Sequence, residues 1–150
     1  VDKFIIPSSS MEPTLQIEDR IFVSKTSKYQ PQLGDIVVFR PTQLAKELDP
    51  DITIRETKFF VKRVVGLPGQ RIKIADGLVY INDFPLAEDY IQEILRYYMP
   101  EYIIPTDNYF VLGDNRNNSF DSHIWGFLPA ENIVGKAYKI YWPPKNIQAL

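Results

Sequence analysis

The chain has 150 residues, 45% of them hydrophobic and 24% charged, which is enough apolar material for a buried core and too much for a disordered chain. A net charge of −2 gives no electrostatic basis for binding nucleic acid. The lack of cysteine excludes disulfides, thiol nucleophiles and thiolate metal sites.

Short runs of β-branched and aromatic residues, separated by turn residues, dominate the sequence. Asp76-Gly77 lies between two alternating runs and predicts a hairpin, because a tight turn needs residues that tolerate positive φ. We therefore expect a single domain over residues 1–150, mainly β, with antiparallel sheets and a few short helices. The expected strands are Arg20–Ser24, Asp35–Arg40, Phe59–Val65, Arg71–Ile74, Leu78–Asn82, Tyr109–Leu112 and Gly135–Trp142.

Two stretches depart from the strand pattern. Residues 41–57 are polar and are expected to form an exposed insertion. Residues 86–98 place Tyr90, Ile94 and Tyr98 at helical spacing, which predicts a helix there. No apolar run approaches the roughly 18 residues that a membrane-spanning helix needs.

Ser8, Ser9 and Ser10 form a polar loop between Pro7 and Pro13. The prolines exclude a helix or a central strand, so the loop is rigid. A serine nucleophile needs such a place, exposed and fixed near backbone N–H groups that stabilise an oxyanion. Hydroxyls that satisfy the backbone of a turn are the alternative, and the segment alone leaves both interpretations open.

Lys62 lies in an expected strand, where alternation places it on one face with Phe60 and Val64. Apolar neighbours keep water from a lysine and lower its pKa, and a neutral amine can act as a general base. Arg63 falls on the other face and needs a partner or solvent. The alternative is an ordinary edge-strand lysine whose amine extends into solvent.

Residues 113–126 follow an expected strand and are rich in Asp, Asn and Ser, which is typical of Asx turns. A calcium loop is excluded because Phe120 and Gly126 stand where that motif needs Gly and Glu. A zinc site is poorly supported, since His123 is the only histidine. A Ser-His-Asp triad through His123 is conceivable, although the chain lacks the Gly-x-Ser-x-Gly elbow.

Taken together and in order, these segments resemble the type I signal peptidase family. The run from Asp121 to Gly126 is more similar to cyanobacterial and plastid members than to enterobacterial ones. The matching segments are Ser8 to Leu15 as the nucleophile segment, Lys62 to Gly69 as the general-base segment, Gly113 to Ser122 as the third catalytic segment, and Asp19 to Val23 and Gly34 to Phe39 as the strands between the first two. Residues 41–57 and 84–105 lie outside the match.

The resemblance implies a role for each matched catalytic residue. Ser10 would be the nucleophile and Lys62 the general base. The Ser10 backbone N–H and the Ser8 hydroxyl would form the oxyanion hole. Ser119 would orient the Lys62 amine, as the acid of a triad orients histidine.

The resemblance also implies supporting contacts. Asp114 would pair with Arg63, and Asp121 would brace the third segment. Two positions depart from the family pattern: Ser9 replaces a common Gly, which matters if that position needs positive φ, and His123 stands where many bacterial members pair an Arg with Asp121.

The implied substrates are signal peptides of exported preproteins, cut after small residues in an Ala-x-Ala pattern, with no cofactor, metal or nucleic acid involved. The apolar surface around the pockets would also face a lipid membrane, and the family's N-terminal anchor would hold this domain on the extracytoplasmic side of the cell membrane. Shallow pockets would select small side chains by excluding larger ones. The expected lining residues are Phe4, Ile6, Met11, Leu15, Ile21, Phe60 and Val61.

Two other functions remain open at this stage. A self-cleaving repressor-type peptidase also uses serine and lysine, but those proteins have a shorter interval than the 52 residues between Ser10 and Lys62. A non-catalytic β-rich binding module, or an inactive relative, is not excluded by composition. The simultaneous presence of the serine, the lysine and Ser119 argues against it.

Overall fold

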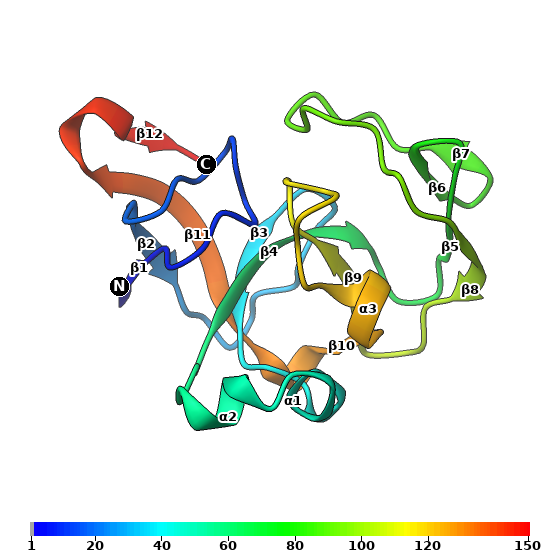
Figure 1. Ribbon diagram of the computed structural model, residues 1–150, viewed down its shortest axis with the longest axis horizontal. Helices are drawn as coiled ribbons and strands as arrows, with labels where there is room; N and C mark the ends of the chain where they lie inside the picture. Colours follow the sequence, from blue (N-terminus) through cyan, green and yellow to red (C-terminus); the bar gives the residue numbers. More distant parts are fainter. Residues whose placement is uncertain (1) are drawn as a thin grey trace.

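Two antiparallel sheets organise the chain in the computed structural model, which describes residues 2–150 (Figure 1). The larger sheet has the order β1-β2-β11-β3-β4-β9-β10, with β12 paired to β11. Its strands are β1 Asp2–Ile5, β2 Arg20–Ser24, β3 Ile36–Phe39, β4 Phe60–Gly66, β9 Asn108–Leu112, β10 Leu128–Pro129, β11 Ile133–Trp142 and β12 Gln148–Ala149.

The smaller sheet, drawn in green at the right of Figure 1, has the order β7-β6-β5-β8. It consists of β5 Arg71–Ala75, β6 Leu78–Ile81, β7 Phe84–Pro85 and β8 Met99–Ile103. The helices are short: α1 Gln43–Leu48, α2 Asp51–Ile54, α3 Ser122–Trp125 and the 3₁₀ turns η1 Ala130–Asn132 and η2 Pro144–Asn146. Among residues 2–150, no helix is long and apolar enough to cross a membrane.

The architecture confirms the mainly β, antiparallel fold class expected from the sequence. Each of the seven expected strands forms, with bounds shifted by two residues at most. The β5–β6 hairpin turns at Asp76 and Gly77, which have φ values of 54° and 80°. Strand β5 buries every second residue, so the alternation that predicted it reflects one covered face.

Strand β4 is different, because five consecutive residues from Lys62 onward are buried. It lies between β3 and β9 near the middle of the larger sheet, where both of its faces are covered. Lys62 and Arg63 are therefore both taken out of water, on opposite faces of one strand. The central position of β4 thus places two basic side chains away from solvent.

The helix expected over 86–98 does not form, and that prediction is wrong. Its backbone groups bond outward: Leu86 N–H donates to Val79 O and Leu95 N–H to Gly77 O, both in the β5–β6 hairpin region. Leu95 is buried, whereas Ile94 is 68% exposed. The apolar residues contact different surfaces and do not form one helical stripe.

Residues 41–57 contain the two helices α1 and α2, which the expectation of an exposed insertion did not include. Thr42 caps α1 by accepting a hydrogen bond from Ala45 N–H at 3.1 Å. Most of the segment is exposed, but Ala45 and Ile52 are buried in a cluster with Phe39. These two buried side chains hold the segment against the core cluster that includes Val64 of β4.

Candidate active site

The structure brings Ser10 and Lys62 into direct contact across 52 residues of sequence. Lys62 Nζ lies 2.7 Å from Ser10 Oγ, within hydrogen-bond distance. Ser10 belongs to the loop between β1 and β2, and Lys62 to the centre of β4. A nucleophile and an amine base at this distance are the minimum that serine–lysine catalysis requires.

Burial makes the Lys62 amine easier to deprotonate. The residue is 4% exposed, and this desolvation lowers its pKa from the usual 10.5 to about 8. The Asp121 carboxylate opposes the effect and favours the charged form. A substantial fraction of the amine is therefore neutral at mildly alkaline pH, as the apolar neighbours Phe60 and Val64 led us to expect.

Ser8 contacts Ser10 directly. Its hydroxyl donates to Ser10 Oγ at 3.2 Å and accepts from the Ser10 backbone N–H at 3.5 Å. The two groups expected to form an oxyanion hole are therefore adjacent to each other and to Ser10 Oγ. Ser9, the position where family members often have Gly, is not among the residues with positive φ in the described chain, so serine fits there without backbone strain.

The loop after β9 holds the nucleophile loop in place. Asn115 N–H donates to Ser10 O at 3.0 Å, and the Asn115 side chain donates to Ser9 O at 3.1 Å. A Cβ on Gly113 would overlap with Ser10 O and with Ser119 Oγ, so only glycine allows this approach. Sequence reasoning did not nominate Gly113 or Asn115 individually, because their role depends on a contact between distant loops.

Asp121 is fully buried and organises the same loop. Its carboxylate accepts hydrogen bonds from Gly113 N–H at 3.0 Å and from His123 N–H at 3.2 Å, which also caps α3. The His123 ring nitrogen Nδ1 contacts the same carboxylate, and the ring stacks on Tyr97. Histidine thus occupies the position expected for the partner of Asp121.

Ser119 differs from its expected arrangement. Its Oγ is buried and makes no hydrogen bond within residues 2–150, so the expected bond to the Lys62 amine does not form here. The hydroxyl instead packs against Gly113. A buried hydroxyl without a partner is uncommon in folded proteins.

Arg63 and Asp114 form a buried two-bond ion pair behind the dyad. Arg63 Nε donates to Asp114 Oδ1 at 2.9 Å and Nη2 to Oδ2 at 2.8 Å, in the fork geometry that suits guanidinium and carboxylate. Thr14 Oγ1 also donates to Asp114, at 2.5 Å. The partner that strand alternation demanded for Arg63 is thus present, and it links β4 to both loops.

A cavity of about 380 Å³ opens onto the dyad. The segment 41–57 provides one wall of it, which sequence analysis did not anticipate for a stretch with no matching motif. The lining residues are Pro7, Ser8, Ser9, Ser10, Asp49, Asp51, Ile52, Arg55, Thr57, Phe59, Phe60, Lys62, Asn118 and Phe120.

The residues expected to line substrate pockets fall into two groups. Phe60 lines the cavity, whereas Phe4 and Val61 do not and are partly buried against the core cluster. The other four, Ile6, Met11, Leu15 and Ile21, are at most 2% exposed and pack together in the hydrophobic core. They lie in the core and not on the cavity wall, because the loop between β1 and β2 folds its apolar side chains inward.

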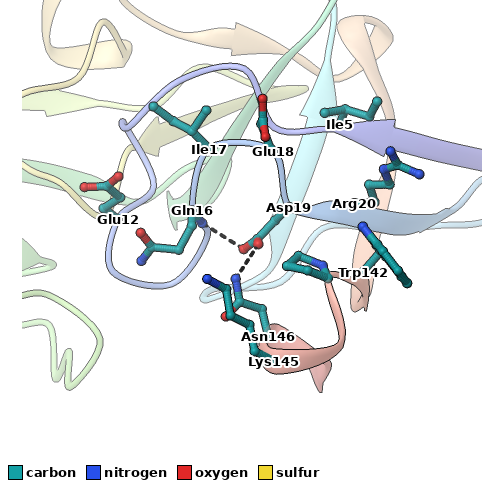
Figure 2. A pocket seen from close by; sticks show the side chains of 11 residues that line it. Ile5, Glu12, Gln16, Ile17, Glu18, Asp19, Arg20, Trp142, Lys145 and Asn146 are labelled. Carbon is teal, nitrogen blue, oxygen red and sulfur yellow. Dashed lines mark hydrogen bonds between the residues drawn. The ribbon is translucent and has the colours of Figure 1, made fainter.

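A larger hollow of about 840 Å³ lies on the other side of the same loop (Figure 2). Asp19 is buried there and accepts hydrogen bonds from Gln16 N–H at 2.8 Å and from the Asn146 side chain at 2.7 Å. The rim carries the exposed side chains of Ile17 and Trp142. This hollow contains neither Ser10 nor Lys62, so it is distinct from the dyad cavity.

The model of the family described as "Signal peptidase, peptidase S26" matches residues 1–142. The chain belongs to the signal peptidase family. Membership confirms the resemblance seen in the sequence and identifies the chain as a serine peptidase of the type that removes signal peptides.

The chain is similar to individual signal peptidases of cyanobacteria and of a plant. A signal peptidase I of Leptolyngbya laminosa is 45% identical over 147 residues, covering 97% of this chain and 70% of the relative. A probable signal peptidase I-2 of Synechocystis is also 45% identical, and the chain spans 65% of it. Thylakoidal processing peptidase 1 of Arabidopsis thaliana is 42% identical, over 95% of this chain and 42% of that protein. These matches confirm the similarity to cyanobacterial and plastid members.

A signal peptidase I of solved structure shares the fold. The crystal structure of the Enterococcus faecalis V583 protein is 30% identical, with a TM-score of 0.52, and the alignment covers 73% of this chain and 98% of that one. Segments outside that alignment include more than a quarter of the present chain. The present chain, which is mainly β, therefore shares its fold with a signal peptidase I.

Proposed function

We propose that residues 1–150 are the catalytic domain of a type I signal peptidase that cleaves by a Ser10–Lys62 dyad. The observation that carries the proposal is the 2.7 Å contact between Lys62 Nζ and Ser10 Oγ, together with a lysine pKa lowered to about 8. A neutral amine in that position accepts the Ser10 proton as Oγ attacks the carbonyl carbon of the scissile peptide bond.

The remaining steps use groups around the dyad. The attack turns the carbonyl oxygen into an oxyanion, which the Ser10 N–H and the Ser8 hydroxyl stabilise. As the carbon–nitrogen bond breaks, protonated Lys62 gives its proton to the leaving amine. Lys62 then takes a proton from water, whose oxygen attacks the acyl carbon of the acyl-enzyme. As the bond from that carbon to Ser10 Oγ breaks, the lysine gives the proton to Oγ and restores Ser10. Ser119 bonds the lysine amine during these steps and keeps it directed at Oγ.

The substrate class in this proposal is the signal peptide of an exported preprotein, cleaved after small residues. The aromatic side chains of Phe59, Phe60 and Phe120 line the cavity beside Ser10. Rigid rings against a packed core leave little room to expand, so a larger residue before the scissile bond would clash. The core cluster of Met11 and Leu15 packs against Phe59, and the cluster of Phe39 packs against Phe60 and Phe120.

Single substitutions of the dyad test the mechanism directly. Ser10→Ala and Lys62→Ala should each abolish cleavage of a peptide that carries an Ala-x-Ala site, with circular dichroism spectra like that of the original protein. Ser8→Ala should lower kcat by about 10²–10³-fold, as loss of one oxyanion donor does. Ser9→Ala is the matched control and should stay active. Cleavage by the Lys62→Ala protein would refute the dyad.

We further propose that the face around the second hollow contacts the lipid membrane on the extracytoplasmic side. The exposed Ile5, Ile17 and Trp142 gather at its rim, with Arg20 and Lys145 beside them (Figure 2). Apolar side chains and a tryptophan suit the boundary between lipid chains and headgroups, and Arg20 and Lys145 can bond headgroup phosphates although acidic residues also line the hollow. These exposed residues, and not the buried pocket residues expected from the sequence, would meet the lipid.

Vesicle sedimentation distinguishes this face from other exposed apolar residues. Trp142→Ala should weaken binding to vesicles that contain phosphatidylglycerol. Phe84 is the control, because it is 74% exposed but lies on the smaller sheet, so Phe84→Ala should leave binding unchanged. Equal binding by the Trp142→Ala variant and the original protein would contradict the assignment of the face.

A further inference from the structure

The segment 86–98, which lies outside the family resemblance, contacts the catalytic loop through a buried ion pair. Arg116 Nη1 and Nη2 donate to Glu88 Oε1 and Oε2 at 2.7 and 2.5 Å. The two side chains are 0% and 4% exposed. Such a pair loses the solvation of both charges, so each partner holds the other in a fixed place.

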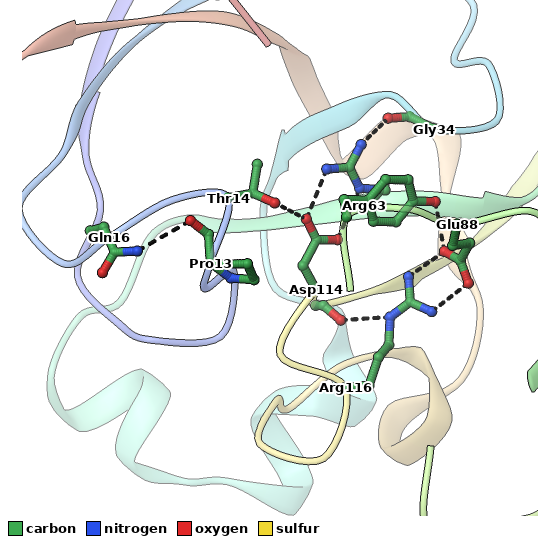
Figure 3. A network of polar contacts seen from close by, with 10 residues as sticks. Pro13, Thr14, Gln16, Gly34, Arg63, Glu88, Asp114 and Arg116 are labelled. Atoms are coloured by element: carbon green, nitrogen blue, oxygen red, sulfur yellow. Dashed lines mark hydrogen bonds and ion pairs between the residues drawn. The ribbon is translucent and has the colours of Figure 1, made fainter. Parts of the chain in front are cut away.

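The same arginine also holds the backbone of the catalytic loop (Figure 3). Arg116 Nε donates to Gly113 O at 2.9 Å. Gly113 is the residue that packs against Ser10 O and Ser119, and its N–H is bonded to Asp121. Glu88 therefore fixes Arg116, and Arg116 fixes the loop that contacts the nucleophile.

Tyr90 connects this ion pair to the strand that carries the base. Its hydroxyl donates to Glu88 Oε2 at 2.6 Å, and its ring lies 3.6 Å from Arg63 Cζ. A guanidinium stacked on an aromatic ring is held by cation–π attraction. Arg63 follows Lys62 in β4 and pairs with Asp114. Through Arg63, Tyr90 therefore contacts both the strand that carries the lysine and the loop that carries Asp114.

We infer that Glu88 and Tyr90 are positioning residues for the Ser10–Lys62 dyad, acting through Arg116 and Arg63. The inference rests on the proposed dyad mechanism. Neither side chain lines the cavity, so neither contacts substrate from its present place. Their effect is to hold two loops and one strand at the spacing that the 2.7 Å contact requires, a spacing to which rates are very sensitive.

Isosteric substitution of Glu88 tests the inference, with its neighbour Asp89 as the matched control. Glu88→Gln keeps the shape but removes the charge that holds Arg116, and should lower kcat about tenfold while KM stays within about twofold. Asp89 is exposed, and Asp89→Asn should leave both constants unchanged. Rates are expressed per active site, titrated with a serine-acylating inhibitor, so that unfolded protein does not count.

A purely structural role would give a different result. If Glu88→Gln lowers the melting temperature but keeps the original kcat per titrated site, the inference is wrong. Should that variant fail to fold, Tyr90→Phe decides, because it removes only the hydroxyl bond to Glu88 and leaves every charge in place. Tyr90→Phe should lower kcat several-fold, and an unchanged kcat would overturn the inference.

These outcomes are separable from failure of the dyad itself. Ser10→Ala is measured alongside on the same peptide. Cleavage by Ser10→Ala would refute the proposed mechanism whatever Glu88 does. Loss of cleavage in Ser10→Ala, combined with equal kcat for Glu88→Gln and Asp89→Asn, would leave the dyad standing and remove only the positioning role.

Discussion

Lys62 Nζ and Ser10 Oγ lie 2.7 Å apart, although one belongs to a central strand and the other to a loop that begins just after β1. The strand buries the amine on a covered face, and the loop places the Ser10 hydroxyl within hydrogen-bond distance of it. Burial and contact act together: the first leaves more of the amine neutral near pH 8, and the second places a hydroxyl proton within its reach.

The rate of cleavage should therefore follow the titration of Lys62. Below its pKa of about 8, the neutral fraction of the amine rises tenfold with each pH unit, and kcat/KM should rise in proportion before levelling off above pH 8. The measurement needs a peptide without groups that ionise between pH 5 and 10. A rate that is flat from pH 5 to pH 9 would contradict lysine as the base.

The same burial should cost stability, with a defined pH dependence. Lys62 binds its proton less tightly in the folded protein, with a pKa of about 8 against the usual 10.5, so the cost is about 3 kcal/mol below pH 8 and disappears as pH rises toward 10.5. Lys62→Met, which keeps the volume without the charge, should raise the free energy of unfolding by about that amount at pH 6 and by little near pH 10.

Urea unfolding at the two pH values measures the difference. Lys58→Met is the control, because Lys58 lies just before β4 and its side chain is exposed to water. A Lys62→Met gain that is equal at pH 6 and pH 10 would mean that it comes from packing alone and not from removal of a buried charge.

Much of the fold follows from local sequence, and the site follows only in part. The strand carrying Lys62 and Arg63 was predictable, because β-branched runs and turn residues act over a few positions. Their placement on opposite faces also followed from alternation, whereas the burial of Arg63 did not, since the pattern allowed either a partner or solvent. The choice of Ser10 among three serines was not, since it depends on a contact 52 residues away.

The contributions of residues 41–57 and 86–98 illustrate what local patterns miss. The apolar spacing over 86–98 predicted a helix, yet Tyr90 contacts Arg63 while Leu95 enters another core cluster. Tyr90 and Leu95 have separate distant partners while Tyr98 is exposed, so tertiary contacts override helix propensity. No local pattern indicates that Glu88 would be buried against Arg116.

Ser119 and Ser122 should respond in opposite ways to alanine. Ser119 Oγ has no hydrogen bond to lose among the described residues, so Ser119→Ala should leave the free energy of unfolding unchanged or slightly higher. If its hydroxyl orients Lys62 during catalysis, kcat should nevertheless fall by about tenfold or more.

Ser122 provides the comparison because its hydroxyl is also buried but already bonded. Its Oγ accepts from Val111 N–H at 3.0 Å, so Ser122→Ala should cost about 1 kcal/mol of stability while kcat stays near its original value. A Ser119→Ala protein with full activity would exclude the orienting role.

Gly113 offers the most direct test of how closely the two loops must approach. Gly113→Ala places a methyl group against Ser10 O and Ser119 Oγ, and backbone on one side prevents relief by a simple side-chain rotation. The loops must separate, which should cost about 1–3 kcal/mol of stability and on the order of 10²-fold in kcat.

Gly135→Ala is the matched control, because its methyl would overlap with Ser24 O between β11 and β2, away from the dyad. It should lose similar stability yet keep kcat per active site, whereas equal losses of kcat in both variants would show that general overpacking, and not displacement of Ser10, lowers the rate.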